Sequence, residues 1–273
     1  MTAKLRLLYR LVLIFLLFSI GLLLAGGLFP MLQIMPVQHA KHYKDAIKMH
    51  WLRWFAAILH CRISLTGALP APGAMVVCNH ISWLDIIVLG RYLPGYFVAK
   101  SDILSWPVIG FLARQAGTIF IRRGDKKHIH TTTEQMLWLL KQFSHIMVFP
   151  EGTTTCGADV LPFHASLFQP ALLTKSIVQP VAISYQGQAK QQAPFVGDDE
   201  FLPHLLKVLR LDVIEVRLDF LPVINSIGQT RASVSDAARS AIRAAITENS
   251  ASAELHDAGK SAYASTGSAR TNK

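Results

Sequence analysis

A long apolar run near the amino terminus places the strongest constraint on what this chain can fold into. The segment Leu11–Phe29 has 19 residues and no charge, and as a helix it would measure about 28 Å, close to the hydrocarbon thickness of a bilayer. We therefore expect a membrane-embedded helix here. A cleaved signal peptide and a buried core helix are the alternatives; a signal peptide is less favoured because its apolar core usually has about 7–15 residues.

A second, amphipathic helix is predicted between Lys41 and Cys61. Apolar side chains recur there at helical spacing, Trp51 and Trp54 among them, with lysines and an arginine interspersed. Such a helix is typical of a membrane interface, and it equally fits packing on a domain with a solvated basic face. Residues 1–60 are thus predicted to form an N-terminal membrane anchor. Cations flank the apolar run on both sides, so they do not fix its orientation, and a spanning and a re-entrant helix both remain open.

Composition narrows the classes of partner. The chain has 273 residues, is 51% hydrophobic and carries a formal net charge of +10 at pH 7. Nucleic acid is disfavoured because the sequence has an apolar membrane segment and no recognisable nucleic-acid-binding module. Anionic membrane lipids are the simpler partner, and an acidic carrier protein is the second. The three cysteines form no CxxC pattern or disulfide framework, which is typical of a domain that faces the cytosol.

Strand-like and helix-like segments alternate along residues 61–247. This alternation predicts an α/β domain with a mainly parallel sheet flanked by helices, preceded by the membrane-embedded helix pair. Residues 187–200 are polar and are expected to form a loop. Residues 248–273 are rich in Ser, Ala, Thr and Gly without apolar periodicity, and we expect a disordered tail there.

A histidine and an aspartate five residues apart form the first chemical motif. The segment Asn79–Asp85 follows a short apolar run and contains both His80 and Asp85. Imidazole is the usual general base near neutral pH, and a carboxylate on its second nitrogen would fix its tautomer and orientation. Such a pair can take the proton of a substrate hydroxyl without any serine or cysteine nucleophile. Ser82 and Asp85 also fit a helix-capping pattern, and both interpretations can hold together.

Three later segments add to this motif. One strand-like segment ends in Arg122 and Arg123, another ends in the sequence Phe-Pro-Glu-Gly-Thr at 149–153, and the apolar strand 177–183 carries a proline. Each has an ordinary explanation when taken singly. Arginines after a strand usually face solvent, Pro-Glu-Gly is common turn chemistry, and a proline often marks an edge strand.

In series, these segments resemble the signature blocks of the glycerolipid (lysophospholipid) acyltransferase family, which includes bacterial 1-acylglycerol-3-phosphate acyltransferases. The blocks match N-H-x4-D at 79–85, G-x-x-F-[IV]-x-R at 117–123, F-P-E-G-T at 149–153 and V-x-P-V-A-I at 178–183. The resemblance covers about residues 52–220. It implies that residues 61–247 form an acyltransferase domain that acts on a lysolipid in phospholipid biosynthesis.

The resemblance also implies roles for individual residues. His80 would remove the proton of the acceptor hydroxyl as the oxygen attacks an acyl thioester, and Asp85 would orient and stabilise the imidazole. Substrate-binding roles would fall to six further residues, namely Asn79, Arg122, Arg123, Glu151, Gly152 and Thr153. No metal and no other cofactor is expected, and acyl carrier protein or coenzyme A would bring the acyl group as a co-substrate. The enzyme would lie at the inner (cytoplasmic) membrane with its catalytic domain facing the cytosol.

One departure from the family pattern bears on the acceptor. The third block usually continues with arginine, whereas this sequence has Thr154, so a guanidinium that could bind a phosphate is missing. We expect 1-acylglycerol 3-phosphate as the acceptor, giving phosphatidate. Lyso-ornithine lipid or another lysolipid is the alternative, because relatives that acylate lyso-ornithine lipid look similar at this block. From another class, a thioesterase or lipase could use Cys78 or Ser82, but the sequence has no G-x-S-x-G motif.

Overall fold

A seven-stranded sheet organises the part of the chain that the computed structural model describes, residues 2–122 and 126–268. The strands lie in the order β1-β7-β6-β2-β5-β3-β4. Their bounds are β1 Cys61–Thr66, β2 Met75–Cys78, β3 Gly95–Lys100, β4 Ile119–Ile121, β5 His145–Val148, β6 Val178–Gln186 and β7 Ile214–Phe220. The predicted α/β class with a mainly parallel sheet is confirmed.

Strand β2 lies at the centre of the sheet, between β5 and β6, and runs parallel to both. Strands β3 and β4 continue this parallel arrangement, whereas β7 is antiparallel to β6 and is joined in parallel by β1. The carboxyl ends of β2, β3, β4 and β5 therefore lie along one edge. Three of the four sequence blocks lie at this edge, directly at or after a strand end, as in open α/β sheets that bind ligands there.

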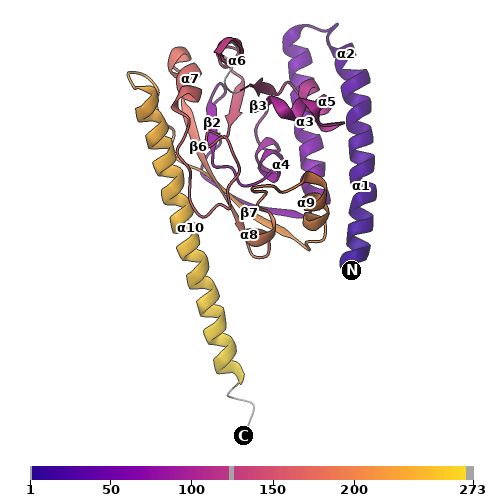
Figure 1. Ribbon diagram of the computed structural model, residues 1–273, viewed down its shortest axis with the longest axis vertical. Coiled ribbons are helices and arrows are strands. Elements are labelled where there is room, and N and C mark those ends of the chain that lie inside the picture. Colours follow the sequence, from indigo (N-terminus) through magenta and orange to yellow (C-terminus); the bar gives the residue numbers. More distant parts are fainter. Residues whose placement is uncertain (1, 123–125, 269–273) are drawn as a thin grey trace.

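Helices cover both faces of the sheet (Figure 1). One core cluster packs α1, α3, α4 and α9 against one face, and two others pack α6, α7 and α10 against the opposite face. The bounds are α1 Ala3–Leu23, α2 Phe29–Leu32, α3 Val37–Ile58, α4 Leu84–Gly90, α5 Ile109–Gln115, α6 Lys126–Lys141, α7 Gln169–Thr174, α8 Ala189–Gln192, α9 Phe201–Val208 and α10 Arg231–Ser268. Short 3-10 segments lie at Ser101–Ser105 and Ala165–Phe168. The expected polar loop at 187–200 thus contains one short helix.

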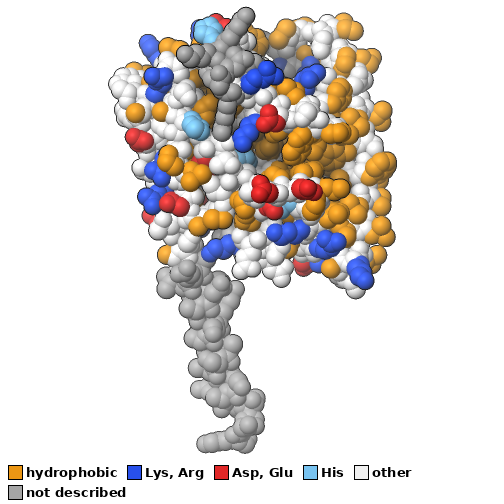
Figure 2. All heavy atoms as spheres, in the orientation of Figure 1, with side chains coloured by type: hydrophobic (Ala, Val, Ile, Leu, Met, Phe, Trp, Pro, Cys, Tyr) orange, Lys and Arg blue, Asp and Glu red, His pale blue; other side chains and the backbone are white. Residues whose placement is uncertain are grey.

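The apolar N-terminal run belongs to a continuous helix that is longer than expected. Helix α1 passes through a π-helical segment, Leu24–Leu28, into α2, and the 30-residue stretch Ala3–Leu32 is long and apolar enough to cross a membrane. The π-helical segment precedes Pro30, whose ring would clash with a regular preceding turn. Figure 2 shows hydrophobic side chains gathered on the side of the molecule that α1 forms.

Helices α1 and α3 lie side by side and pack against the domain (Figure 1). The indole Nε1 of Trp51 donates to the carbonyl of Leu17 at 3.0 Å, and its ring lies edge-on to Phe18 with centroids 5.3 Å apart. Near the start of α1, the buried guanidinium of Arg10 donates to the carbonyls of Leu209 and Leu211. The Trp51 contacts therefore hold the two helices together, and the Arg10 contacts fix α1 to the domain.

The carboxyl-terminal helix is longer than the sequence predicted. The sequence predicts a disordered tail from residue 248 onward, whereas α10 continues to Ser268. Alanine recurs through this stretch and has the highest intrinsic helix propensity, which opposes the disorder that its polar composition indicated.

Candidate active site

The imidazole of His80 is bonded to the carboxylate of Asp85. His80 follows β2 and Asp85 lies in the first turn of α4, so the strand-to-helix turn brings the two side chains together. Nδ1 of His80 lies 2.8 Å from Oδ2 of Asp85. The contact makes Nδ1 the protonated nitrogen, because an ionised carboxylate only accepts hydrogen bonds. The other nitrogen, Nε2, is then the basic one.

Asp85 is held from four directions and is fully buried. Its Oδ2 also accepts the backbone N–H groups of Ile81, at 2.7 Å, and Ser82, at 2.9 Å, while Oδ1 accepts the hydroxyl of Tyr185 at 2.7 Å. Such a carboxylate is fixed by its four partners and shielded from solvent, as an orienting group for a catalytic imidazole should be. Half of the expected capping box is present: Asp85 reaches back to the turn, but the buried hydroxyl of Ser82 has no partner among the described residues.

Tyr185 is the site residue that sequence reasoning missed. It lies on β6, two residues beyond the fourth block, and its buried side chain faces the core cluster of α4. Burial, and then the charge of Asp85, raise the pKa of Tyr185 well above its usual value, so its hydroxyl stays a donor. A buried tyrosine hydroxyl needs a partner, and this rule was the available signal.

The His80 ring lies flat against Phe149 while keeping one accessible edge. The two ring centroids are 4.0 Å apart with planes 15° from parallel. The side chain of His80 remains 19% exposed, and within the described part of the chain no hydrogen bond engages its Nε2. The stacking fixes the ring plane, and the open nitrogen is available to a substrate hydroxyl.

Glu151 bridges two backbone segments instead of facing an open site. Its Oε1 accepts the N–H of His80 at 2.7 Å, and its Oε2 accepts the N–H of Leu161 at 2.8 Å. The residue is 5% exposed, and burial raises the pKa of its carboxyl although both N–H donors oppose the shift. Both oxygens therefore hold backbone groups in place, and the substrate-binding role expected for Glu151 stays a prediction.

Asn79 is likewise occupied by the backbone. Its amide donates to the carbonyl of Ile183 at 2.9 Å and accepts the N–H of the same residue at 2.8 Å, with 1% of the residue exposed. It pairs the end of β2 with β6, and the substrate-binding role expected for it stays a prediction. Gly152 adopts a φ of 68°, a conformation suited to glycine, and its N–H donates to the carbonyl of Phe149. Thr153 is exposed at this edge.

The arginines of the second block follow β4. Arg122 is exposed directly beyond the carboxyl end of this strand, on the sheet edge that carries His80. Arg123 lies outside the described residues. Because β3 and β5 separate β4 from β2, a ligand that contacts both Arg122 and His80 must extend across two strand ends.

Thr154 connects the third block to the loop at Phe195, which is hydrogen-bonded to the turn between β2 and α4. Its hydroxyl donates to the carbonyl of Phe195, and the N–H of Phe195 donates to the carbonyl of Ile81 at 3.0 Å. The N–H of Thr155 donates to the carbonyl of His80 at 2.8 Å. The residue that stands in place of the family's arginine is therefore used to join loops.

The possible nucleophiles of a hydrolase are poorly placed. Cys78 lies inside β2, fully buried, and burial raises the pKa of its thiol well above the usual value. Ser82 is fully buried. Cys156 is exposed, but no general base bonds to it among the described residues. A thiol or hydroxyl nucleophile needs an adjacent base to activate it, and within the described residues no base is bonded to any of these three groups.

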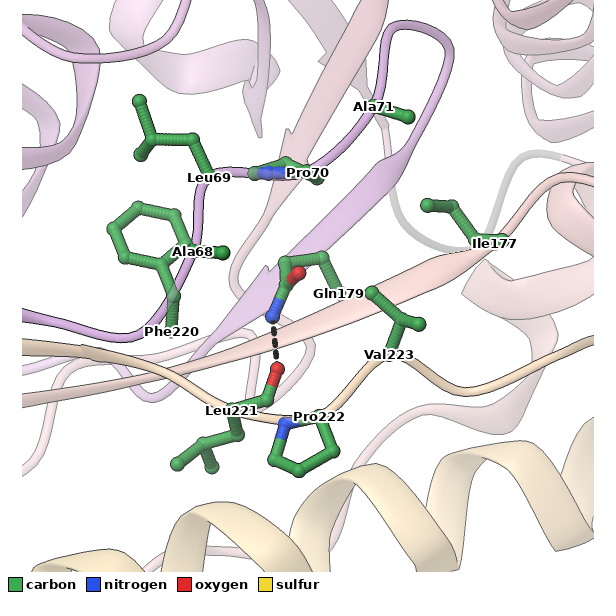
Figure 3. Close-up of a pocket in the computed structure, with 10 residues that line it drawn as sticks. All are labelled: Ala68, Leu69, Pro70, Ala71, Ile177, Gln179, Phe220, Leu221, Pro222 and Val223. Carbon is green, nitrogen blue, oxygen red and sulfur yellow. Dashed lines mark hydrogen bonds between the residues drawn. The ribbon is translucent and has the colours of Figure 1, made fainter.

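A hollow of about 520 Å³ lies at the opposite edge of the sheet from His80. Figure 3 shows it between the loop after β1, the start of β6 and the end of β7, with apolar side chains around Gln179. The amide of Gln179 donates to the carbonyl of Leu221 and is thus occupied. The residues that line this hollow include no acid–base group, so it offers no alternative to the His80–Asp85 pair as the candidate catalytic site.

Comparison with known proteins agrees with this geometry. Residues 44–184 match the family described as Acyltransferase, and this span contains His80, Asp85 and all four blocks. The chain belongs to the acyltransferase family. The resemblance found in the sequence is thereby confirmed, as are the expected enzyme class and its place in lipid biosynthesis.

Relatives of known name fall into two groups. The chain is 37% identical to a lyso-ornithine lipid O-acyltransferase of Pseudomonas aeruginosa, over 89% of this chain and 95% of that protein. It is 31% identical to a 1-acyl-sn-glycerol-3-phosphate acyltransferase of Neisseria meningitidis, over 68% of this chain and 76% of that one. In fold it is similar to the crystal structure of PlsC, a 1-acyl-sn-glycerophosphate acyltransferase from Thermotoga maritima, with a TM-score of 0.66 over 90% of this chain and 98% of that chain, at 19% identity.

Proposed function

We propose that this acyltransferase moves a fatty acyl group from a thioester to the free hydroxyl of lyso-ornithine lipid. The observation that carries the acyl-transfer reaction is the open Nε2 of His80, whose Nδ1 is bonded to the buried Asp85. Coenzyme A or acyl carrier protein supplies the thioester, and no other cofactor takes part.

The reaction follows from this pair as one displacement. Nε2 of His80 takes the proton of the acceptor hydroxyl while its oxygen attacks the thioester carbonyl. Asp85 stabilises the resulting imidazolium. As the tetrahedral intermediate collapses, the C–S bond breaks and the thiolate takes the proton back from His80. The products are an ester and a free thiol, and no acyl group is attached to the protein.

The developing oxyanion needs hydrogen-bond donors, and two backbone N–H groups near His80 already have acceptors. The N–H of Ser82 is bonded to Asp85, and the N–H of Gly152 is bonded to Phe149. The N–H of Thr153, at the same turn, has no partner in the described part of the chain, and we assign it to the oxyanion.

The choice of acceptor rests on the relatives and on charge. A lyso-ornithine lipid O-acyltransferase matches over nearly its whole length, whereas the 1-acyl-sn-glycerol-3-phosphate acyltransferase matches at lower identity over less of its length. Thr154 supplies no cation and is bonded to Phe195. On the same loop, three exposed acidic residues follow Phe195 closely: Asp198, Asp199 and Glu200. They favour an acceptor with an ammonium group over one with a doubly charged phosphate.

The acceptor 1-acylglycerol 3-phosphate is the second candidate, favoured by the Neisseria relative and by the exposed Arg122. Purified enzyme assayed with both lysolipids decides between them. Transfer to 1-acylglycerol 3-phosphate alone would overturn our choice. Asp198→Lys should raise the KM for lyso-ornithine lipid several-fold. Asp236→Lys, the same charge change at an exposed residue of α10, should not.

We further propose that α1 and α3 anchor the enzyme in the cytosolic leaflet of the cytoplasmic membrane. Helix α1 exposes many large apolar side chains, with Phe15 71% and Leu23 75% exposed. Helix α3 lies beside it and carries a buried ion pair between Lys48 and Asp45 at 2.8 Å. Embedding in one leaflet covers the apolar face without moving these charges through the hydrocarbon.

Fractionation of the full chain tests the anchor. Leu23→Glu should release part of the enzyme from membranes in high salt or carbonate, because a charge would enter the apolar layer. Trp138→Glu, at a 57% exposed residue on α6, is the matched control and should leave fractionation unchanged. Equal behaviour of the two variants would contradict the proposed anchor.

A further inference from the structure

Helix α10 holds the loop that follows the third block through one arginine. Nε of Arg239 donates to the carbonyls of Val160 and Leu161, both at 3.0 Å, and a terminal nitrogen donates to Val160 at 2.7 Å. Arginine suits this contact because its planar group presents several donors in fixed directions. Two consecutive peptide groups of the loop are therefore oriented from α10.

The same loop continues the chain of contacts toward the catalytic histidine. The N–H of Leu161 donates to Oε2 of Glu151, and Oε1 of Glu151 accepts the N–H of His80. Three consecutive links thus join α10 to the residue whose imidazole is the base: guanidinium to loop, loop to carboxylate, and carboxylate to the His80 backbone. Glu151 is buried, so water does not replace a lost link easily.

We propose that Arg239 is a positioning residue for acyl transfer, acting through Leu161 and Glu151 on the backbone of His80. The inference rests on the proposed function for its catalytic consequence, while the chain of contacts is independent of which lysolipid is the acceptor. Loss of the guanidinium frees the 160–161 peptide groups to rotate. Glu151 then loses a donor, and His80 loses a fixed backbone position relative to Asp85.

Arg243 offers a matched control one turn further along α10. It pairs with Asp159 on the same loop, at 2.7 Å, but both side chains are more than half exposed and the contact reaches no loop carbonyl. An exposed ion pair contributes little to stability. Arg243→Gln therefore removes the same charge from the same helix without breaking the proposed chain of contacts.

A double-mutant cycle on the full-length enzyme tests the proposal. Arg239→Gln should lower kcat about tenfold with little change in the KM for the acyl thioester, Arg239→Lys should recover part of the loss, and Arg243→Gln should leave kcat unchanged. If Arg239 acts through Glu151, the Arg239→Gln, Glu151→Gln double variant should be no slower than Glu151→Gln alone. Additive losses would overturn the proposal.

Amide hydrogen exchange gives a readout that does not depend on activity. Arg239→Gln should speed exchange at the N–H groups of Leu161 and His80, whereas Arg243→Gln should not. Unchanged protection at both amides in Arg239→Gln would overturn the inference. A wild-type enzyme that acylates no lysolipid would instead refute the proposed function, so the two failures are distinguishable.

Discussion

His80 and His204 lie on either side of the turn that begins α4, and the structure uses the same side chain differently in the two places. His80 has one nitrogen on Asp85 and one open edge. His204, on α9, has both nitrogens occupied: Trp83 donates its indole N–H to Nδ1 at 3.0 Å, and Nε2 lies 2.9 Å from the carbonyl of Pro194. His204 is 3% exposed.

The difference shows what separates the proposed base, His80, from a structural histidine in this molecule. Burial lowers the pKa of His204, and its two contacts require the neutral ring with hydrogen on Nε2. The ring of His204 links α9 to the loop at Pro194 and, through Trp83, to the turn that begins α4. His80 differs in both contacts. Its orienting partner is a carboxylate, and its second nitrogen forms no hydrogen bond within the described residues.

The largest expected effect is at His80. His80→Ala should lower kcat by about 10²- to 10⁴-fold or more, because it removes the base. Asp85→Asn should also be severe through lost orientation and charge stabilisation. Thioester-consumption assays with lysolipid present measure both variants, and circular dichroism with membrane fractionation checks that they remain folded and anchored. Near-normal turnover by folded His80→Ala would remove the distinction between the two histidines.

Tyr185 sharpens the comparison by testing how firmly the base must be held. Tyr185→Phe removes one hydrogen bond to the buried charge of Asp85, and bonds to charged groups are worth more than neutral ones. We expect kcat to fall roughly 10- to 100-fold. Tyr92→Phe is the control, since that ring lies outside the site. Equal rates for the two variants would show that the remaining contacts of Asp85 suffice.

Arg122 tests whether the His80 edge also binds the acceptor headgroup. Arg122→Ala should raise the KM for 1-acylglycerol 3-phosphate, the second candidate acceptor, about two- to fivefold. It should leave kcat nearly unchanged, because exposed ion pairs are weak. Arg231→Ala, at an exposed arginine at the start of α10, is the matched control. A fall in kcat without a change in KM would place Arg122 in the chemical step instead.

The smallest expected effect is the contribution of His204 to the pH dependence of the protein's stability. Because its pKa is lowered in the fold, the unfolded chain binds a proton more readily at mildly acidic pH. Its contribution to stability is complete above the unfolded pKa of about 6.5 and is lost as the pH falls from there through the folded pKa. The thermal midpoint should therefore drop more on acidification from pH 7 to pH 5 in wild type than in His204→Gln. Parallel pH profiles would show that His204 is not the titrating group.

The sequence predicted the sheet and the His80–Asp85 pair because both depend on local patterns. Alternating apolar runs report buried strands, and residues five apart across a strand-to-helix turn meet without long-range information. It did not predict that Asn79 and Glu151 would bond to backbone groups, nor that Tyr185 would bond to Asp85. Those contacts join segments about 70 to 100 residues apart in the chain, so only the folded arrangement reveals them.

The predicted ends of the N-terminal helix differ from the observed ends for a related reason. The charge-free run predicts only part of the N-terminal helix. Arg6 and Arg10 are also helical, and the domain supplies their partners around residues 209–212. Tertiary contacts of this kind extend helices beyond their apolar pattern.

The most direct measurement follows the acyl thioester when no acceptor is present. The account makes the acceptor hydroxyl the nucleophile, so the full-length enzyme incubated with thioester alone should release no burst of thiol, and its intact mass should stay unchanged. Adding lysolipid should then release thiol in step with ester formation, and only when His80 is present. A stoichiometric thiol burst with an acyl adduct on Cys78, Ser82 or Cys156 would contradict the account.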